Sequence, residues 1–251
     1  MDKSSMLYWW PKVKDISVPK PETIIIRIGY RPLLGMLDGE PLRPDLHAKI
    51  MAATRQLDYP LFVRTDQASG KHDWERTCYV DYSGTLWKNI YRLIEFNEIA
   101  GVFGLQPEAL VFRKYIPLEA PFKAFYGQMP VARERRYFVR DGGVECHHPY
   151  WIEDAISEWW ERVAELGAAG VLKAWDQDKL EPLPTNWREV LAELNNETQE
   201  EIKLLTAYAE EIGRAIGKGY WSVDFAKGQD GVWYFIDMAE GEKSWHPEHE
   251  K

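Results

Sequence analysis

The feature that most constrains this chain is a hairpin pattern built around the turn sequence GQDG at residues 228–231. Gly and Asp tolerate the positive φ angles of tight hairpin turns, and aromatic and β-branched residues flank this turn on both sides. With a two-residue loop, Asp224 faces Phe235 on the opposite strand. Side-chain alternation then places Asp237 diagonally beside Asp224. The sequence therefore predicts two neighbouring strands that carry two carboxylates on one face of a sheet.

Two carboxylates held side by side require a counterion, because adjacent anions repel unless one is protonated or a cation lies between them. Oxygen ligands on neighbouring strands suit Mg²⁺ that arrives with nucleotide phosphates. Glu240 or Glu242 can add a ligand, and we take Glu240 as the third candidate beside Asp224 and Asp237. The alternative is a solvated hairpin with scattered acids.

A second pattern lies upstream, in the segment PLFVRTDQASGKHDWERTCYV at residues 60–80. A strand ends near Arg64 and runs into a loop of small residues that contains Lys71. Backbone N–H groups of such a loop can approach an anion, and the two bases supply positive charge. The Walker spacing GxxxxGK[ST] is missing, so this is a phosphate-binding loop of another kind or else a mobile surface turn.

Two further segments carry chemistry. The apolar run at residues 108–119 is typical of a strand that passes into a linker at Pro117, and its backbone can serve an adenine edge. Residues 128–151 predict another hairpin, with Glu134 and Arg136 on one face and Arg135 on the other. We expect Arg136 to bind the anionic group of an acceptor and Arg135 to point to solvent.

The order of these segments resembles the ATP-grasp superfamily, in particular its small phage and prokaryotic members with a VRTDxxSGKHDW-like stretch, over roughly residues 60–247. The resemblance implies an α+β fold in which two lobes with antiparallel sheets clasp ATP. It implies a first lobe at 59–117 and a second at 118–251 that bears the metal-binding hairpin. The N-terminal part, 1–58, is expected to be an α/β segment.

The resemblance also assigns roles to individual residues. Phosphate-binding bases, an adenine hinge, a ribose ligand and metal ligands are implied, respectively, at Arg64 and Lys71; at Lys114, Tyr115 and Ile116; at Glu119; and at Asp224 and Asp237. The candidate catalytic residues are Arg136, Lys71 and Glu134. The chain departs from the family where Asp237 replaces a Glu and Ala239 stands in place of an Asn, and Glu240 is taken as the substitute ligand.

Composition fits a soluble enzyme and limits its partners. With 251 residues and 45% hydrophobic content, the chain can bury one core or two joined lobes. The two cysteines are far apart, and no secretory or membrane-spanning pattern is present, which favours the reducing cytoplasm. The net charge of −9 disfavours sequence-blind binding of nucleic acid.

The sequence thus predicts an ATP-grasp ligase that uses ATP and Mg²⁺ to activate a carboxylate as an acyl phosphate. The acceptor is expected to be a small molecule or peptide with an anionic group. Two alternatives stay open: nucleic-acid end repair or another phosphotransfer, and a non-enzymatic ATP-binding assembly chaperone. The sequence names neither the acceptor nor the oligomeric state.

Overall fold

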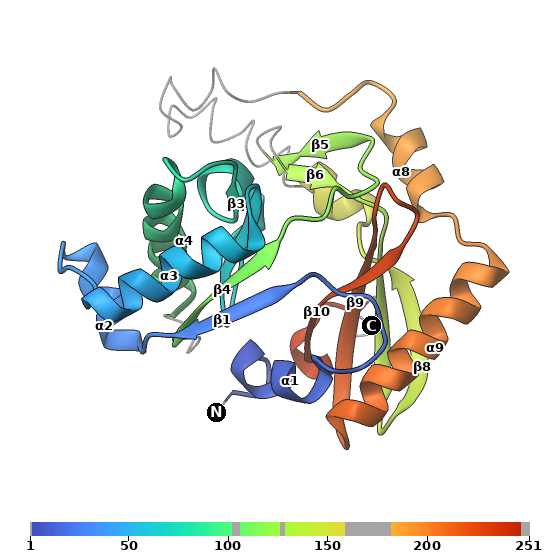
Figure 1. Ribbon diagram of the computed structural model, residues 1–251. Helices are drawn as coiled ribbons and strands as arrows, with labels where there is room; N and C mark the ends of the chain where they lie inside the picture. The colour runs from blue at the N-terminus through green and yellow to red at the C-terminus, as the bar shows by residue number, and fades with distance from the viewer. Residues whose placement is uncertain (1, 102–105, 126–128, 159–181, 247–251) are drawn as a thin grey trace. The chain divides into compact units, whose positions relative to one another are not determined.

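A computed structural model describes residues 2–101, 106–125, 129–158 and 182–246. The chain divides into two compact units, each with its own antiparallel sheet (Figure 1). One unit contains residues 5–7 and 21–116, and the other contains residues 1–4, 8–20 and 117–251. The predicted α+β class is confirmed. Residues 21–58, expected as part of a separate segment, contribute a strand and two helices to the unit that also holds residues 59–116.

The unit of residues 21–116 is built on a four-stranded antiparallel sheet in the order β1-β4-β2-β3. Its strands are β1 (Thr23–Arg27), β4 (Ala109–Lys114), β2 (Leu61–Thr65) and β3 (Tyr79–Val80). The central strand β4 is buried at every position before Lys114. Burial on both faces explains why its sequence is a continuous apolar run rather than an alternating one.

Three helices complete the core of this unit: α2 (Tyr30–Leu37), α3 (Pro44–Leu57) and α4 (Leu86–Gly101). Pro at the first position of α3 fits the helix start, because the N–H that proline lacks has no partner there in any case. Apolar residues of the helices and strands form one buried cluster, which includes Leu33, Ile50, Val63, Ile90 and Phe112. The short 3-10 helix η1 (Lys71–Arg76) follows β2 and carries one of the predicted phosphate bases.

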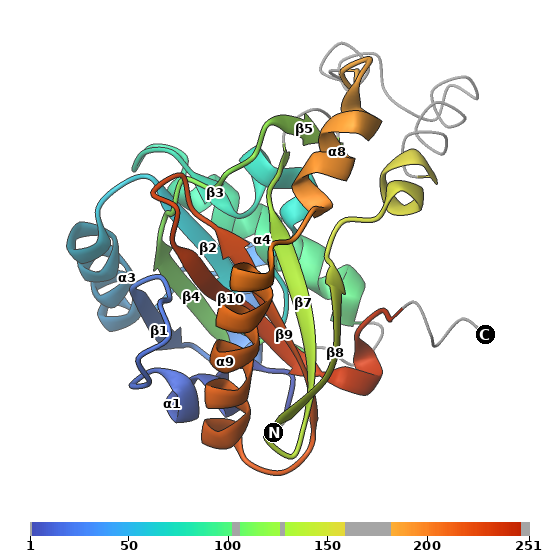
Figure 2. The same ribbon diagram turned by 90° about the vertical axis from the view of Figure 1, so that its right-hand side faces the viewer.

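The unit of residues 117–251 contains a four-stranded antiparallel sheet in the order β10-β9-β7-β8 and a two-stranded sheet of β5 and β6. The bounds are β5 (Phe122–Ala124), β6 (Met129–Val131), β7 (Glu134–Arg140), β8 (Gly143–Pro149), β9 (Tyr220–Lys227) and β10 (Trp233–Glu240). The helices are α8 (Trp187–Asn195) and α9 (Gln199–Ile216), with most of α1 (Met6–Val13) and the 3-10 helix η2 (Gly241–Lys243). Figure 2 shows α9 lying along the four-stranded sheet.

Helix α9 begins at the position that the sequence predicts and packs through a regular apolar stripe. Thr198 Oγ1 accepts the Glu201 N–H at 3.1 Å, and the Glu201 carboxylate accepts the Thr198 N–H at 3.2 Å. This reciprocal capping box fixes the first turn. Leu205, Ala209 and Ile212 recur every three to four residues and are fully buried, as an amphipathic helix on a sheet requires.

The β9–β10 hairpin forms, but its register differs from the prediction. Gly228 N–H donates to Val232 O at 2.8 Å, so three residues rather than two form the loop, and Gly231 adopts φ 80° there. A bulge between Phe235 and Asp237 shifts the register by one more residue. Asp237 therefore lies directly opposite Asp224 instead of diagonally.

Two expectations fall largely outside the described residues. The helix predicted at 152–166 is seen only in its first part, to residue 158, and the loop predicted at 174–188 is described only from residue 182. Across the described part of the chain, no helix has the length and apolar character that would let it cross a membrane.

Candidate functional site

A row of polar side chains crosses the β10-β9-β7-β8 sheet. In the observed register Asp237 pairs with Asp224, Asp224 with Arg136, and Arg136 with His148, one residue from each of the four strands. Cross-strand partners point to the same side of a sheet, so all four side chains lie on one face. Alternation along β9 places Asp224 on this face, between two buried apolar neighbours, Val223 and Phe225, that point to the other side.

Arg136 and Asp224 form a two-pronged ion pair at the centre of this row. Arg136 Nε and Nη2 each donate to one Asp224 carboxylate oxygen, and both distances are 2.8 Å. The two side chains are 14% and 8% exposed. Burial lowers the pKa of Arg136, but the charge and hydrogen bonds of Asp224 outweigh it, so that the pKa is raised above its ordinary value. The guanidinium also lies 4.6 Å from the ring centre of Tyr150, a cation–π distance.

The predicted metal ligands are brought together in part. Asp224 and Asp237 are neighbours, whereas Glu240 is three residues further along β10, on the opposite side by alternation, and pairs with Lys3 and Lys243. Among the described residues no group of three His, Cys, Asp or Glu side chains is placed to hold a metal. Two carboxylates still fit Mg²⁺, which is commonly held by one or two protein carboxylates together with substrate phosphates and water.

The neighbours of Arg136 on β7 alternate as predicted, but the environment of one of them is not the predicted one. Glu134 is buried, and its carboxylate accepts the Trp151 indole N–H at 3.1 Å. Arg135 points to the other side, yet not to solvent. Its side chain is fully buried, pairs with Glu197 at 2.9 Å and donates to backbone carbonyls of the segment that joins α8 to α9. The expectation that Arg135 faces solvent is wrong, because this helix-linking segment covers that face.

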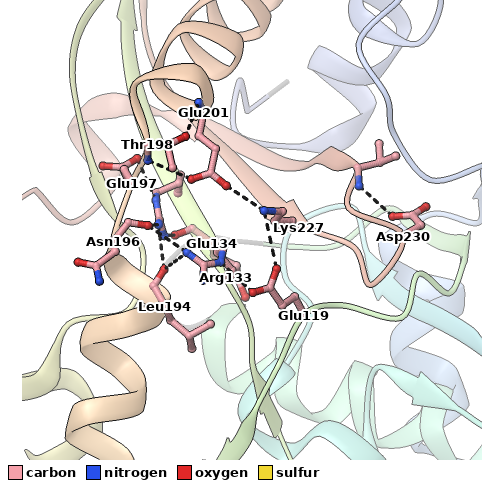
Figure 3. Close-up of polar contacts among 12 residues, drawn as sticks. Glu119, Arg133, Glu134, Leu194, Asn196, Glu197, Thr198, Glu201, Lys227 and Asp230 are labelled. Carbon is pink, nitrogen blue, oxygen red and sulfur yellow. Dashed lines mark hydrogen bonds and ion pairs between the residues drawn. The ribbon is translucent and has the colours of Figure 1, made fainter.

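Glu119, the predicted ribose ligand, belongs to a charged network that Figure 3 shows. Arg133 Nε donates to Glu119 at 3.0 Å, and Lys227 Nζ lies 3.9 Å from the same carboxylate and 2.9 Å from Glu201. Arg133 also donates to the backbone oxygen of Leu194. Burial raises the pKa of Glu201, but the bonds from Lys227 and the helix cap prevail and lower it. The network ties the chain after the hinge to β9 and to the start of α9.

The predicted phosphate bases lie in the other unit, around the end of β2. Arg64 is buried there, and its Nε donates to Thr65 O at 3.0 Å. Lys71 is half-buried and begins η1, directly after Gly70 in a left-handed conformation. Burial raises the pKa of the Cys78 thiol to about 12, while the charges of Lys71 and Arg64 act in the opposite direction. Both bases thus exert their charge on the same buried thiol.

The predicted adenine hinge follows β4. Lys114 is the exposed last residue of that strand, and Tyr115 and Ile116 are half-buried. The Tyr115 ring packs edge-on against Tyr79 and Trp74, with ring centres 5.2 and 6.4 Å apart. Burial is the first cause that raises the pKa of the Tyr115 hydroxyl. The aromatic cluster fixes the orientation of the hinge residue but shows no ligand.

Sequence reasoning missed three contributors to these surroundings: His148, Tyr150 and Lys227. His148 was weighed only as a metal ligand, although its position opposite Arg136 follows once the β7–β8 register is known. Burial lowers the pKa of His148, and the charge of Arg136 lowers it further. Lys227 closes a strand full of apolar residues, and this position was the available signal.

Comparison with known proteins identifies the family. The model of an ATP-grasp domain family, family 3 of its clade, matches residues 52–251, and the chain belongs to it. No curated protein matches the sequence. The resemblance to the ATP-grasp superfamily that the motif order indicates is therefore confirmed.

Solved structures agree at the level of the fold. C-terminally truncated Cdc123 from Schizosaccharomyces pombe is 10% identical, with a TM-score of 0.54 over 94% of this chain and 83% of that one. A RimK domain ATP-grasp protein from Sphaerobacter thermophilus DSM 20745 is 12% identical, with a TM-score of 0.44 over 96% of this chain. D-alanine–D-alanine ligase from Bacillus anthracis, complexed with ATP, is 13% identical, with a TM-score of 0.47 over 98% of this chain. The chain spans 59% and 58% of the latter two proteins.

Proposed function

We propose that this protein is an ATP-dependent ligase that requires Mg²⁺ and activates a carboxylate as an acyl phosphate for attack by a nucleophile. The observation that carries the proposal is the row Asp237–Asp224–Arg136 on one face of the sheet. It sets two anions that suit a divalent cation beside a guanidinium that suits an anionic substrate. Membership of the ATP-grasp family supports the use of ATP.

Each residue of the proposed site has a defined task. Asp224 and Asp237 would hold Mg²⁺, which when bound neutralises charge on the nucleotide phosphates. Arg64 and Lys71 would bind the phosphates, Arg64 from a buried strand end and Lys71 from the start of η1. Arg136 would orient the acceptor through its carboxylate or phosphate, because a planar guanidinium donates two parallel N–H groups to such an anion.

Further roles follow from the contacts. Lys114, Tyr115 and Ile116 would meet the adenine, and Glu119 would accept hydrogen bonds from the ribose hydroxyls. The contacts of Glu119 with Arg133 and Lys227 would hold its carboxylate in place for this role. Glu134 would act indirectly, since its carboxylate accepts a bond from Trp151 within the sheet that carries Arg136. We do not include Glu240 among the metal ligands, because it pairs with lysines on the other side of β10.

The test is release of ADP from ATP and Mg²⁺ over a panel of acceptors: amino acids, dipeptides, hydroxy acids and short oligonucleotides with 5′ or 3′ phosphates. A ligase releases ADP and phosphate only when a carboxylate and a nucleophile are both present. Hydroxylamine should trap the acyl phosphate as a hydroxamate, which gives a readout that does not depend on the natural nucleophile.

Other outcomes of the same assay would replace the proposal. ADP release that requires an oligonucleotide end would indicate nucleic-acid repair or another phosphotransfer. Binding of ATP without ADP release under any condition would favour a non-enzymatic role in assembly. The formal net charge of −9 argues against the oligonucleotide outcome, since it repels a polyanion.

A further inference from the structure

Asp224 already has a counterion in the structure. Both of its carboxylate oxygens accept N–H groups of Arg136 at 2.8 Å. Neither side chain is more than 14% exposed, so water screens the pair weakly. The Tyr150 ring lies against the guanidinium and further fixes it. The carboxylate best placed to hold a divalent cation is therefore occupied by a guanidinium.

A guanidinium and a divalent cation compete for such a carboxylate. Two like charges within a few ångströms of each other repel strongly where the surroundings are poorly screened. A carboxylate that gives both oxygens to a fork of N–H donors must also rotate or release one of them to coordinate a metal. Asp237 lies directly opposite Asp224, so the row carries two negative charges. One guanidinium neutralises half of that charge, whereas a divalent cation neutralises all of it.

We propose that Arg136 is a placeholder for the metal: it holds Asp224 in the absence of ligand and leaves it when a divalent cation arrives with the nucleotide. The released guanidinium then binds the anionic group of the acceptor. This inference rests on the proposed function and adds an order to it, in which metal and nucleotide bind first and the acceptor second. By linkage, an anion that binds Arg136 strengthens the binding of the metal by the same factor.

The test uses Mn²⁺ as a paramagnetic probe together with a non-hydrolysable ATP analogue. Free Mn²⁺ gives a solution resonance that disappears on binding, so a titration yields the dissociation constant of the ion without any turnover. The variant Arg136→Met removes the competing charge and keeps an unbranched side chain of similar length. We expect it to bind Mn²⁺ about tenfold or more tightly than the unaltered protein.

Arg140→Met is the matched control. Arg140 lies on the same strand, is half exposed and pairs with Glu145 rather than with a carboxylate of the row. It changes the net charge by the same amount, and we expect Mn²⁺ affinity to stay within about twofold, because an exposed charge is screened by solvent.

Stability provides a second readout. Arg136→Met leaves the buried Asp224 without its partner, so the metal-free variant should melt earlier, and Mn²⁺ should raise its melting temperature more than that of the unaltered protein. If Arg136→Met does not fold, Arg136→Lys decides the question. Lysine cannot reproduce the two-pronged pair, so Mn²⁺ should still bind more tightly than to the unaltered protein.

The outcomes separate the two levels of the proposal. Equal or weaker Mn²⁺ binding by the Arg136 variants, with clear binding by the unaltered protein, would overturn the placeholder role and leave the proposed function standing. If the unaltered protein and both Arg136 variants fail to take up Mn²⁺ with the nucleotide analogue, the metal-dependent function itself falls, and the inference falls with it.

Discussion

Arg135 offers the sharpest stability prediction, because it is an arginine with no exposed surface. Its guanidinium pairs with Glu197 at 2.9 Å and donates to the backbone oxygens of Leu194 and Asn196 at 2.8 and 2.9 Å. These partners belong to the segment between α8 and α9. The change Arg135→Ala removes all of these bonds at once and leaves Glu197, itself 14% exposed, without its strongest partner.

The magnitude follows from the burial of the pair. Removing one partner of a buried ion pair costs about 3–5 kcal/mol, because the remaining charge stays desolvated. For a chain of this size each kcal/mol lowers the melting temperature by about 2–4 °C, so we expect a fall of about 6 °C or more. Differential scanning calorimetry of Arg135→Ala measures it. Arg140→Ala, which removes an exposed arginine of the same strand, should cost less than about 1 kcal/mol.

A double change refines the test. If the buried pair is the cause, Glu197→Gln in the Arg135→Ala background should restore part of the lost stability, because no uncompensated carboxylate then remains. A melting temperature for Arg135→Ala within about 1 °C of the unaltered protein, by the same scale of about 2–4 °C per kcal/mol, would refute the reasoning. It would mean that water or another group satisfies Glu197 as well as the arginine does.

Three further predictions follow from single contacts. Under native conditions iodoacetamide should modify Cys146, which is half-buried, and spare Cys78, whose thiol is fully buried with its pKa raised to about 12; mass spectrometry of the tryptic peptides checks this, and modification of Cys78 first would contradict it. Lys71→Ala should reduce ATP turnover far more than it lowers the melting temperature, since Lys71 is the half-buried first residue of a short 3-10 helix, and an early-melting variant with normal turnover would make it a structural residue. Thr198→Ala should cost about 1 kcal/mol through loss of the cap of α9, measurable by urea denaturation, and Thr198→Ser should restore most of it.

The hairpin of Asp224 and Asp237 shows what the sequence could predict and what it could not. Turn residues and alternation indicate two adjacent strands with both carboxylates on one side, and the structure has them there. The register was wrong by two steps, a three-residue loop and a bulge after Phe235. A bulge inserts one residue with no side-chain signal, because Ile236 suits a bulged position as well as a regular one.

Arg135 shows a second limit. Period-two alternation predicts correctly that it points away from Arg136, but alternation cannot say what covers the other face. The cover comes from Leu194 and Asn196, 59 and 61 residues further along the chain. Contacts at such separation depend on how α8 and α9 pack. Local sequence signals carry no information on that packing.

The helices were more predictable because their signals are local. The cap at Thr198 and the apolar stripe that follows it fix both the start and the buried face of α9. The same reasoning located α4 at Leu86, where an apolar stripe begins. Glu240 had no such local signal for its partners, since Lys3 lies at the other end of the chain and Lys243 in the 3-10 helix that follows β10.

The measurement that tests the central claim most directly is calorimetric titration of the non-hydrolysable ATP analogue in the presence and absence of Mg²⁺, with the variants Asp237→Asn and Asp230→Asn. Asp237 faces Asp224 across the hairpin, whereas Asp230 is an exposed acid of its turn and bears the same charge. We predict that Mg²⁺ strengthens binding to the unaltered protein and to Asp230→Asn, and that Asp237→Asn loses most of this gain. Equal Mg²⁺-dependent affinity in all three proteins would contradict a metal site at Asp224 and Asp237.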